Sequence, residues 1–105
     1  MGKYVLVYTG GGGMAETDEA RDAQVSAWMN WFGGLGDAIA DAGNPFGPSV
    51  TVGSDGSARD GGASSHTGYS MVNADSLAAA ADMAKGCPVL TGGGSVEVYE
   101  TFDVM

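Results

Sequence analysis

Hydrophobic residues follow two different spacings along the chain, and the switch between them predicts where strands give way to helices. The run 3–9 is almost continuously apolar, which is typical of a strand covered on both faces. After Thr17, a good N-cap residue, apolar side chains recur every three or four positions as far as Ile39. We therefore expect one long helix that ends near Gly43.

The second half of the chain repeats this strand and helix pattern on a smaller scale. Residues 66–73 and 95–100 alternate between apolar and polar positions, as strands with one polar face do. Between them, the alanine-rich stretch 77–84 follows Asp75 or Ser76, either of which can cap a helix. The sequence thus predicts a strand, a short helix and a final strand.

The middle of the chain, residues 44–65, is rich in turn-forming residues. It contains a short β-rich segment at 49–52 and an Asp55-Gly56 pair, a common hairpin turn, so we expect an edge strand with a hairpin extension. The predicted order is then β-α-β-β-α-β, the ferredoxin-like α+β arrangement, with both helices on one face of a four-stranded antiparallel sheet. A chain of 105 residues fits a single domain, residues 1–105.

Strand alternation also predicts which side chains the helices cover. We expect the valines of the first and last strands to face the helices, and the tyrosines to lie on the other face. A half-aromatic face is rarely left open to water, so we expect a second copy to cover it and form a homodimeric barrel. The side chains assigned to the uncovered face are Tyr4, Leu6, Tyr8, Glu97 and Tyr99.

Four motifs in residues 68–100 resemble the YCII-related proteins. They are Gly68-Tyr69-Ser70, Ala74-Asp75-Ser76-Leu77, Ala84-Lys85-Gly86-Cys87-Pro88 and Gly92-Gly93-Gly94-Ser95-Val96-Glu97-Val98. The resemblance implies a ferredoxin-like subunit paired into a dimeric α+β barrel. It implies less about activity, because most of the family has no assigned role. A few relatives are thought to act on small, often aromatic, molecules, with a His–Asp pair proposed as catalytic.

Charge and cysteine content narrow the class of partner. A net charge of −9 disfavours nucleic acid and anionic membrane surfaces, and the single Cys87 rules out an intrachain disulfide and points to the cytoplasm. We expect no cofactor, because acidic residues follow the glycine run 10–13 where a dinucleotide phosphate would bind. The acidic residues lack the spacing of a metal site, and nothing predicts a membrane span.

Glu97 is the first candidate for chemistry. On the expected uncovered face it would be surrounded by Tyr4, Tyr8, Ser70 and Tyr99, which would bind a small organic ligand under a lid formed by the 10–13 loop. A carboxyl group in such a half-buried cavity has a raised pKa, which suits acid/base catalysis. The alternative is that the same residues form a polar dimer interface with no catalytic role.

His66 is the second candidate, because imidazole titrates near neutral pH. As a general base it needs an orienting carboxylate, and Asp60, Asp75 and Glu97 are available; alternatively it is an exposed loop residue. The sequence therefore leaves two functions open. One is a small-molecule enzyme that works by proton transfer in the dimer cleft, and the other is a non-catalytic ligand-binding or assembly protein.

Overall fold

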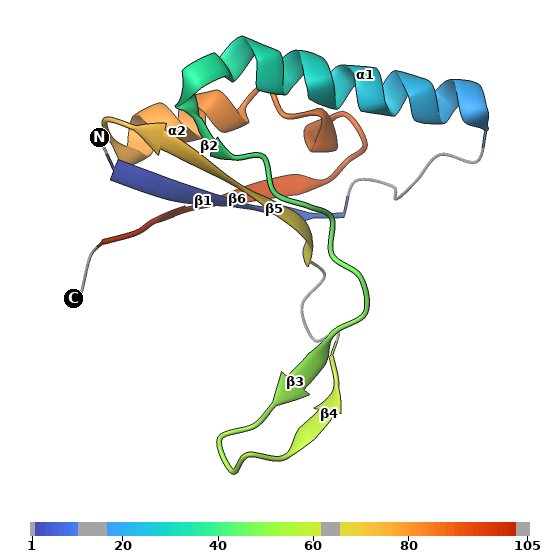
Figure 1. Cartoon of the computed structure of the whole chain (residues 1–105), viewed down its shortest axis with the longest axis vertical. Coiled ribbons are helices and arrows are strands. Elements are labelled where there is room, and N and C mark those ends of the chain that lie inside the picture. The colour runs from blue at the N-terminus through green and yellow to red at the C-terminus, as the bar shows by residue number, and fades with distance from the viewer. Residues whose placement is uncertain (1, 11–16, 62–65, 103–105) are drawn as a thin grey trace.

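Strands and two α-helices are formed by the residues that the computed structural model describes, which are 2–10, 17–61 and 66–102 (Figure 1). Four strands form an antiparallel sheet in the order β2-β5-β1-β6, and a separate two-stranded hairpin joins β3 to β4. Single turns of 3-10 helix cover 36–38 and 88–90. The elements are β1 (Gly2–Thr9), α1 (Asp18–Leu35), β2 (Ile39–Asp41), β3 (Val50–Val52), β4 (Ala58–Asp60), β5 (His66–Ala74), α2 (Leu77–Ala84) and β6 (Ser95–Glu100).

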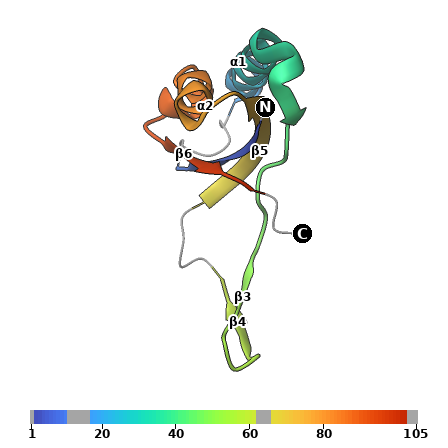
Figure 2. The ribbon, with the colours of Figure 1, turned by 90° about the vertical axis from the view of Figure 1, so that its left-hand side faces the viewer.

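Both helices lie on the same face of the four-stranded sheet, and the other face carries no helix in the described part of the chain (Figure 2). The core fills the space between sheet and helices. Leu6 of β1 and Val72 of β5 are fully buried there, beneath Ala80 of α2. The small alanine side chains let α2 approach the sheet closely. The expected α+β class, with an antiparallel four-stranded sheet, is confirmed.

Local capping signals in the sequence placed the starts of both helices correctly. The Thr17 hydroxyl accepts a hydrogen bond from the backbone N–H of Ala20 at 3.1 Å, and Ser76 accepts one from Ala79 at 3.1 Å. Each cap satisfies one of the backbone donors that a helix N-terminus leaves unpaired. Of the two candidates for the second cap, Ser76 is the one used.

The end of the first helix was predicted eight residues too late. The helix ends at Leu35, where Gly36 adopts a positive φ of 54° and its N–H bonds to the carbonyl of Phe32. The chain then turns back as β2, so residues 39–41 supply the edge strand that we had expected at 49–52. Residues 50–52 instead pair only with 58–60, outside the main sheet.

Gly43 allows the chain after β2 to lie against β5. Its φ is +74°, and a Cβ at this position would stand 1.8 Å from the carbonyl oxygen of Tyr69. No side chain fits such a gap. The close approach sets up the hydrogen bond from the Tyr69 N–H to the Asn44 carbonyl (3.3 Å) and the one from the Phe46 N–H to the Thr67 carbonyl (2.8 Å).

We expect Gly43→Ala to lower the free energy of unfolding by about 2–4 kcal/mol, because the methyl group adds backbone strain to a steric clash. Urea denaturation would measure this. The matched control is Gly34→Ala in α1, where no atom lies within 4 Å of the added methyl and helix propensity predicts a gain of about 1 kcal/mol. Equal effects at the two positions would show that the approach at Gly43 does not constrain the fold.

Candidate functional site

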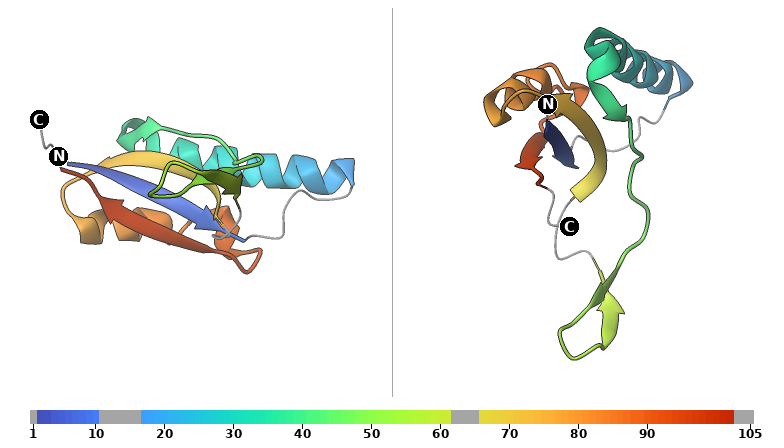
Figure 3. Two further views of the ribbon diagram at one scale, coloured as in Figure 1. Left: turned by 90° about the horizontal axis from the view of Figure 1, so that it is seen from below. Right: turned by 60° about the vertical axis from the view of Figure 1, so that its left-hand side comes forward.

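The uncovered face of the sheet is formed by the odd-numbered residues of β1 and their cross-strand neighbours. Val7 lies between Tyr69 on β5 and Glu97 on β6. One row further along, Val5 lies between Met71 and Tyr99. Figure 3 (left) looks onto this face, with the β3–β4 hairpin standing in front of it. Apolar and aromatic side chains therefore meet solvent on one side of the molecule.

Tyr4, Tyr8 and Ser70 do not belong to this face, so the site proposed around Glu97 is not formed as predicted. Both tyrosines are 5% exposed and Ser70 is fully buried, all three on the side that carries the helices. Leu6 lies with them. The expected orientation of the first strand is wrong, whereas Glu97 and Tyr99 do lie on the uncovered face and Val96 and Val98 pack against the core.

The size of the side chains explains why the tyrosine side of β1 is buried. The Tyr8 ring contacts two rings of α1 edge-on, with centroids 5.0 Å from Trp28 and 6.4 Å from Trp31. The large tyrosine rings fill the space between β1 and the long helix α1. The smaller Val5 and Val7 lie on the opposite, less buried face of the strand. Both faces of this strand are apolar, so alternation alone could not tell them apart.

A chain of hydrogen bonds satisfies the buried hydroxyl groups. The Tyr8 hydroxyl donates to the Ser70 Oγ at 2.6 Å, and the Ser70 hydroxyl donates to the Ala42 carbonyl at 2.5 Å. Burial raises the pKa of Tyr8 well above its usual value and raises the pKa of the nearby Cys87 thiol to about 11. Both groups are thus neutral at physiological pH, and their surroundings suit a structural role better than a nucleophilic one.

Glu97 and Tyr99 form a pair of their own on the uncovered face. They are two residues apart on β6, and the Tyr99 hydroxyl donates to Glu97 Oε2 at 2.6 Å. This hydrogen bond, together with the negative charge of Glu97, raises the pKa of Tyr99. Both side chains are exposed in the single chain. They form a polar, negatively charged surface patch beside Val5 and Val7 of β1.

A β-bulge turns His66 onto the same face. Tyr8 pairs with Gly68 but Thr9 pairs with His66, so Thr67 is the extra residue on β5. Without it, His66 would point to the helix side with Gly68 and Ser70. The Thr67 hydroxyl holds the bulge by sharing its one hydrogen between the carbonyl oxygens of Tyr8 and Gly10, each 3.3 Å away.

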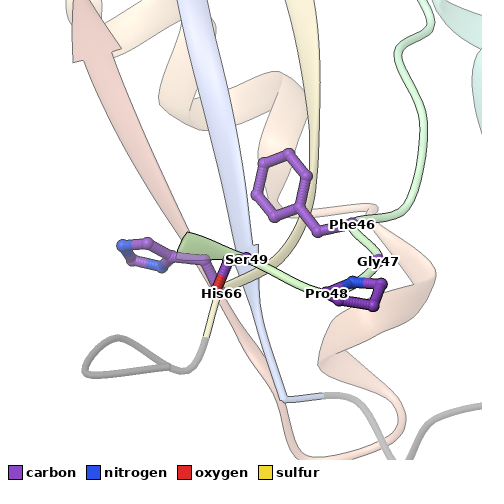
Figure 4. A pocket seen from close by; sticks show the side chains of 5 residues that line it. All are labelled: Phe46, Gly47, Pro48, Ser49 and His66. Atoms are coloured by element: carbon purple, nitrogen blue, oxygen red, sulfur yellow. The ribbon is translucent and has the colours of Figure 1, made fainter. Parts of the chain in front are cut away.

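His66 lines an open hollow of about 360 Å³ at the base of the hairpin (Figure 4). Its Nδ1 shares a hydrogen bond with the Thr9 hydroxyl at 3.2 Å. The Phe46 ring stacks on Tyr69 with centroids 5.8 Å apart and planes 18° from parallel. The hollow therefore combines the Phe46 ring with the His66 imidazole and the Ser49 hydroxyl. Its lining residues are Phe46, Gly47, Pro48, Ser49 and His66.

The structure does not bring His66 and Glu97 together. They lie on β5 and β6 with β1 between them, so two strand spacings of about 4.8 Å each separate their backbones. Asp75 follows the opposite end of β5, and no carboxylate among the described residues hydrogen-bonds to the imidazole. A His–carboxylate pair for proton transfer is not formed within the described chain.

Sequence reasoning missed Phe46, Pro48 and Ser49 as site residues, because 44–48 was taken only as a turn and Ser49 as the start of a short strand. The sequence did contain a signal for Phe46, because this aromatic residue lies between Pro45 and Pro48. The two prolines exclude the segment from a helix interior and from a central strand. Such a residue must rest on the surface of another element, here on Tyr69 of β5. The expected lid over the site falls largely on residues 11–13, outside the described residues.

Neither a metal site nor a membrane-spanning helix is found in residues 2–10, 17–61 and 66–102. No three His, Cys, Asp or Glu side chains gather there in a way that could hold a metal ion. None of the described helices combines the length and the hydropathy needed to cross a bilayer. Comparison of the chain with protein-family models and with curated proteins gives no match.

The shifted pKa values predict that stability falls in alkali. The folded chain keeps the Cys87 proton up to about pH 11, whereas the unfolded chain releases it near pH 9.0, so the folded state binds more protons between these values. The free energy of unfolding must then decrease as the pH rises through this window. Buried Tyr8 acts in the same direction above its ordinary pKa of 10.0.

Urea denaturation at about pH 8 and about pH 10.5 tests this linkage. We expect Cys87→Ala to lose less stability than the wild-type chain over that interval, whatever its stability at the lower pH. An identical loss in both proteins would mean that the thiol is not desolvated in the folded state.

Proposed function

We propose that this chain is a YCII-related, ferredoxin-like subunit that pairs into a homodimer through its uncovered sheet face and binds a small organic molecule in the hollow at His66. The single buried, free Cys87 supports a cytoplasmic location. The observation that carries the proposal is the placement of the hollow beside an apolar sheet face that residues 2–10, 17–61 and 66–102 leave uncovered.

The strand order supports the ferredoxin-like assignment. Without the β3–β4 hairpin, the chain runs strand, helix, strand, strand, helix, strand, and the sheet order β2-β5-β1-β6 is that of a split βαβ unit. Residues of the YCII-like motifs have structural roles here. A Cβ on Gly68 would lie 3.2 Å from the Asn44 carbonyl oxygen, Ser76 caps α2, and Cys87 is buried in the core.

The residues of the uncovered face support dimerisation. Val5, Val7 and Met71 are only partly buried, and Tyr99 is 48% exposed. Covering such side chains contributes about 25 cal/mol for each Å² removed from water, which favours a partner over solvent. An identical face supplies matching apolar rows under two-fold symmetry.

The hollow suits a small, planar and uncharged or cationic molecule. The Phe46 ring, held by its stacking on Tyr69, offers a flat apolar surface, while Ser49 and His66 offer hydrogen bonds. A volume of about 360 Å³ is near the lower limit for a ligand site, enough for one or two rings. The net charge of −9 creates a field that repels anions.

Binding without catalysis is the better-supported of the two functions. His66 is oriented by the hydroxyl of Thr9, a weaker general-base partner than a carboxylate, and Glu97 is two strands away. The enzyme alternative rests on the Glu97–Tyr99 pair, whose 2.6 Å hydrogen bond would enter the dimer cleft when a second copy covers it.

A nuclear magnetic resonance titration with phenol, indole and benzamide tests the ligand site. We expect shifts centred on His66 and Phe46, and at least a tenfold loss of affinity in Phe46→Ala because one wall of the hollow is removed. Phe102→Ala is the matched control, since Phe102 is 79% exposed beyond β6 and outside the lining. Shifts that map elsewhere, or equal affinities for the two variants, would contradict the assignment.

Sedimentation equilibrium tests the dimer. We expect its dissociation constant to fall when salt is raised from about 0.05 M to about 0.5 M, because screening weakens the repulsion between two acidic copies.

Val5→Asp on the uncovered face should weaken the dimer at least tenfold by burying a charge. Val25→Asp on α1 is the control, since that side chain is already 60% exposed. A wild-type chain that stays monomeric at every salt concentration would refute the dimer.

A further inference from the structure

The last strand, β6, forms a free edge of the four-stranded sheet and is drawn in red in Figure 3 (left). It pairs with β1 in a regular register from Ser95 to Glu100, and no described strand lies on its other side. The opposite edge is different, because β2 has only three residues and pairs with β5 across an irregularity. β6 is therefore the longer and more regular of the two edges.

The backbone of β6 directs alternate residues toward β1 and away from it. Directly after the strand, the Thr101 N–H donates to the Lys3 carbonyl at 3.2 Å. In an antiparallel pair every second residue bonds to the same neighbour, so the N–H and C=O groups of the residues between them point outward. In β6 these outward residues are Val96, Val98 and Glu100. Their outward groups have no backbone partner in the described part of the chain.

β6 lacks several features by which sheet edges avoid pairing with other chains. The strand contains neither proline nor lysine, and its register against β1 has no bulge. Proline, lysine and bulges are common means of protecting an edge strand. The backbone of β6 is thus open to a further strand, and its two glutamates act mainly against a strand that is itself acidic.

An open apolar groove of about 170 Å³ lies beside this edge, on the helix side of the sheet. Leu90 in its lining is 41% exposed, and the one charged residue there, Lys85, is already paired with Asp82 at 2.8 Å. A strand added to β6 would direct every second side chain toward this groove, where apolar side chains fit. The lining residues are Ala81, Ala84, Lys85, Leu90, Val96 and Val98.

The charge on β6 favours a cationic strand. Glu97 on the uncovered face and Glu100 at the end of the strand are exposed, and neither forms an ion pair within the described ranges. Lys3 of β1 lies opposite Thr101, four residues from Glu97 and so about 13 Å away along the sheet. A second copy of β6 would bring the same acids to the edge, whereas lysine or arginine side chains would be attracted to them.

We propose that β6 binds an extended segment of a basic protein, which adds a fifth strand to the sheet. In this segment apolar residues alternate with lysine or arginine. The apolar side chains cover the groove, and the cations lie beside Glu97 on the other face. Backbone hydrogen bonds and the groove supply affinity, while the charges select the sequence. The inference goes beyond the proposed dimer and ligand site and depends on neither.

Fluorescence anisotropy with a labelled Lys-Val-Lys-Val-Lys-Val-Lys peptide tests the edge. We expect saturable binding to the wild-type chain. The Glu-Val-Glu-Val-Glu-Val-Glu peptide should bind at least tenfold more weakly, because its carboxylates would lie beside Glu97. The two peptides have the same length and the same valines, so the difference between them reports charge. Absence of saturable binding by the lysine peptide overturns the proposal.

Methylation of the peptide backbone tests whether a strand is added. In an extended peptide the N–H groups of all the valines point to one edge and those of all the lysines to the other. N-methylation of the set that faces β6 should weaken binding at least tenfold, and N-methylation of the other set should change it by less than about threefold. Similar effects of the two methylated peptides would show that β6 does not pair with the peptide backbone.

Glu97→Lys tests where the peptide binds. At about 0.05 M salt we expect it to weaken binding of the lysine peptide at least fivefold and to strengthen binding of the glutamate peptide, because an attraction becomes a repulsion. Glu19→Lys is the matched control, since Glu19 is an exposed acid on α1 and its replacement changes the net charge equally. Equal losses in the two variants would mean that net charge, and not β6, attracts the peptide, and would overturn the proposal.

Discussion

The buried phenol of Tyr8 is the interaction on which the rest of the structure depends. Its ring packs edge-on against Trp28 and Trp31, and its hydroxyl begins the hydrogen-bond chain through Ser70 to the Ala42 carbonyl. One side chain thus joins β1, α1, β5 and the segment that follows β2. A buried hydroxyl without a hydrogen-bond partner costs free energy, so moving any one of these four segments would leave a buried polar group unpaired. The four segments are therefore held in place together.

The orientation of β1 then decides the character of the opposite face. Because the tyrosines lie under the helices, the valines are left on the uncovered side, where they form an apolar stripe between Tyr69 with Met71 and Glu97 with Tyr99. The anchored Ala42 also directs the chain past Gly43 along β5, which seats Phe46 on Tyr69. The position of Phe46 in the hollow therefore depends on the same buried contact.

Local signals predicted the elements well and their assembly less well. The strands at 66–74 and 95–100 and the cap at Ser76 could be read from short stretches, because alternation and capping depend on near neighbours. The buried side of β1 could not, since both of its faces are apolar and the choice depends on rings from α1. The hollow was equally hidden, because Phe46 and His66 meet only through strand pairing across twenty residues.

Because Thr67 is an extra residue in β5, the number of residues between His66 and Gly68 decides which face of the sheet the His66 imidazole lies on. A related chain that lacked one residue between the positions of His66 and Gly68 could keep both amino acids and still turn its histidine under the helices. The length of this short segment therefore decides which face of the sheet carries the imidazole. Percentage identity would rank two such chains as near equals although only one of them has its histidine on the face away from the helices.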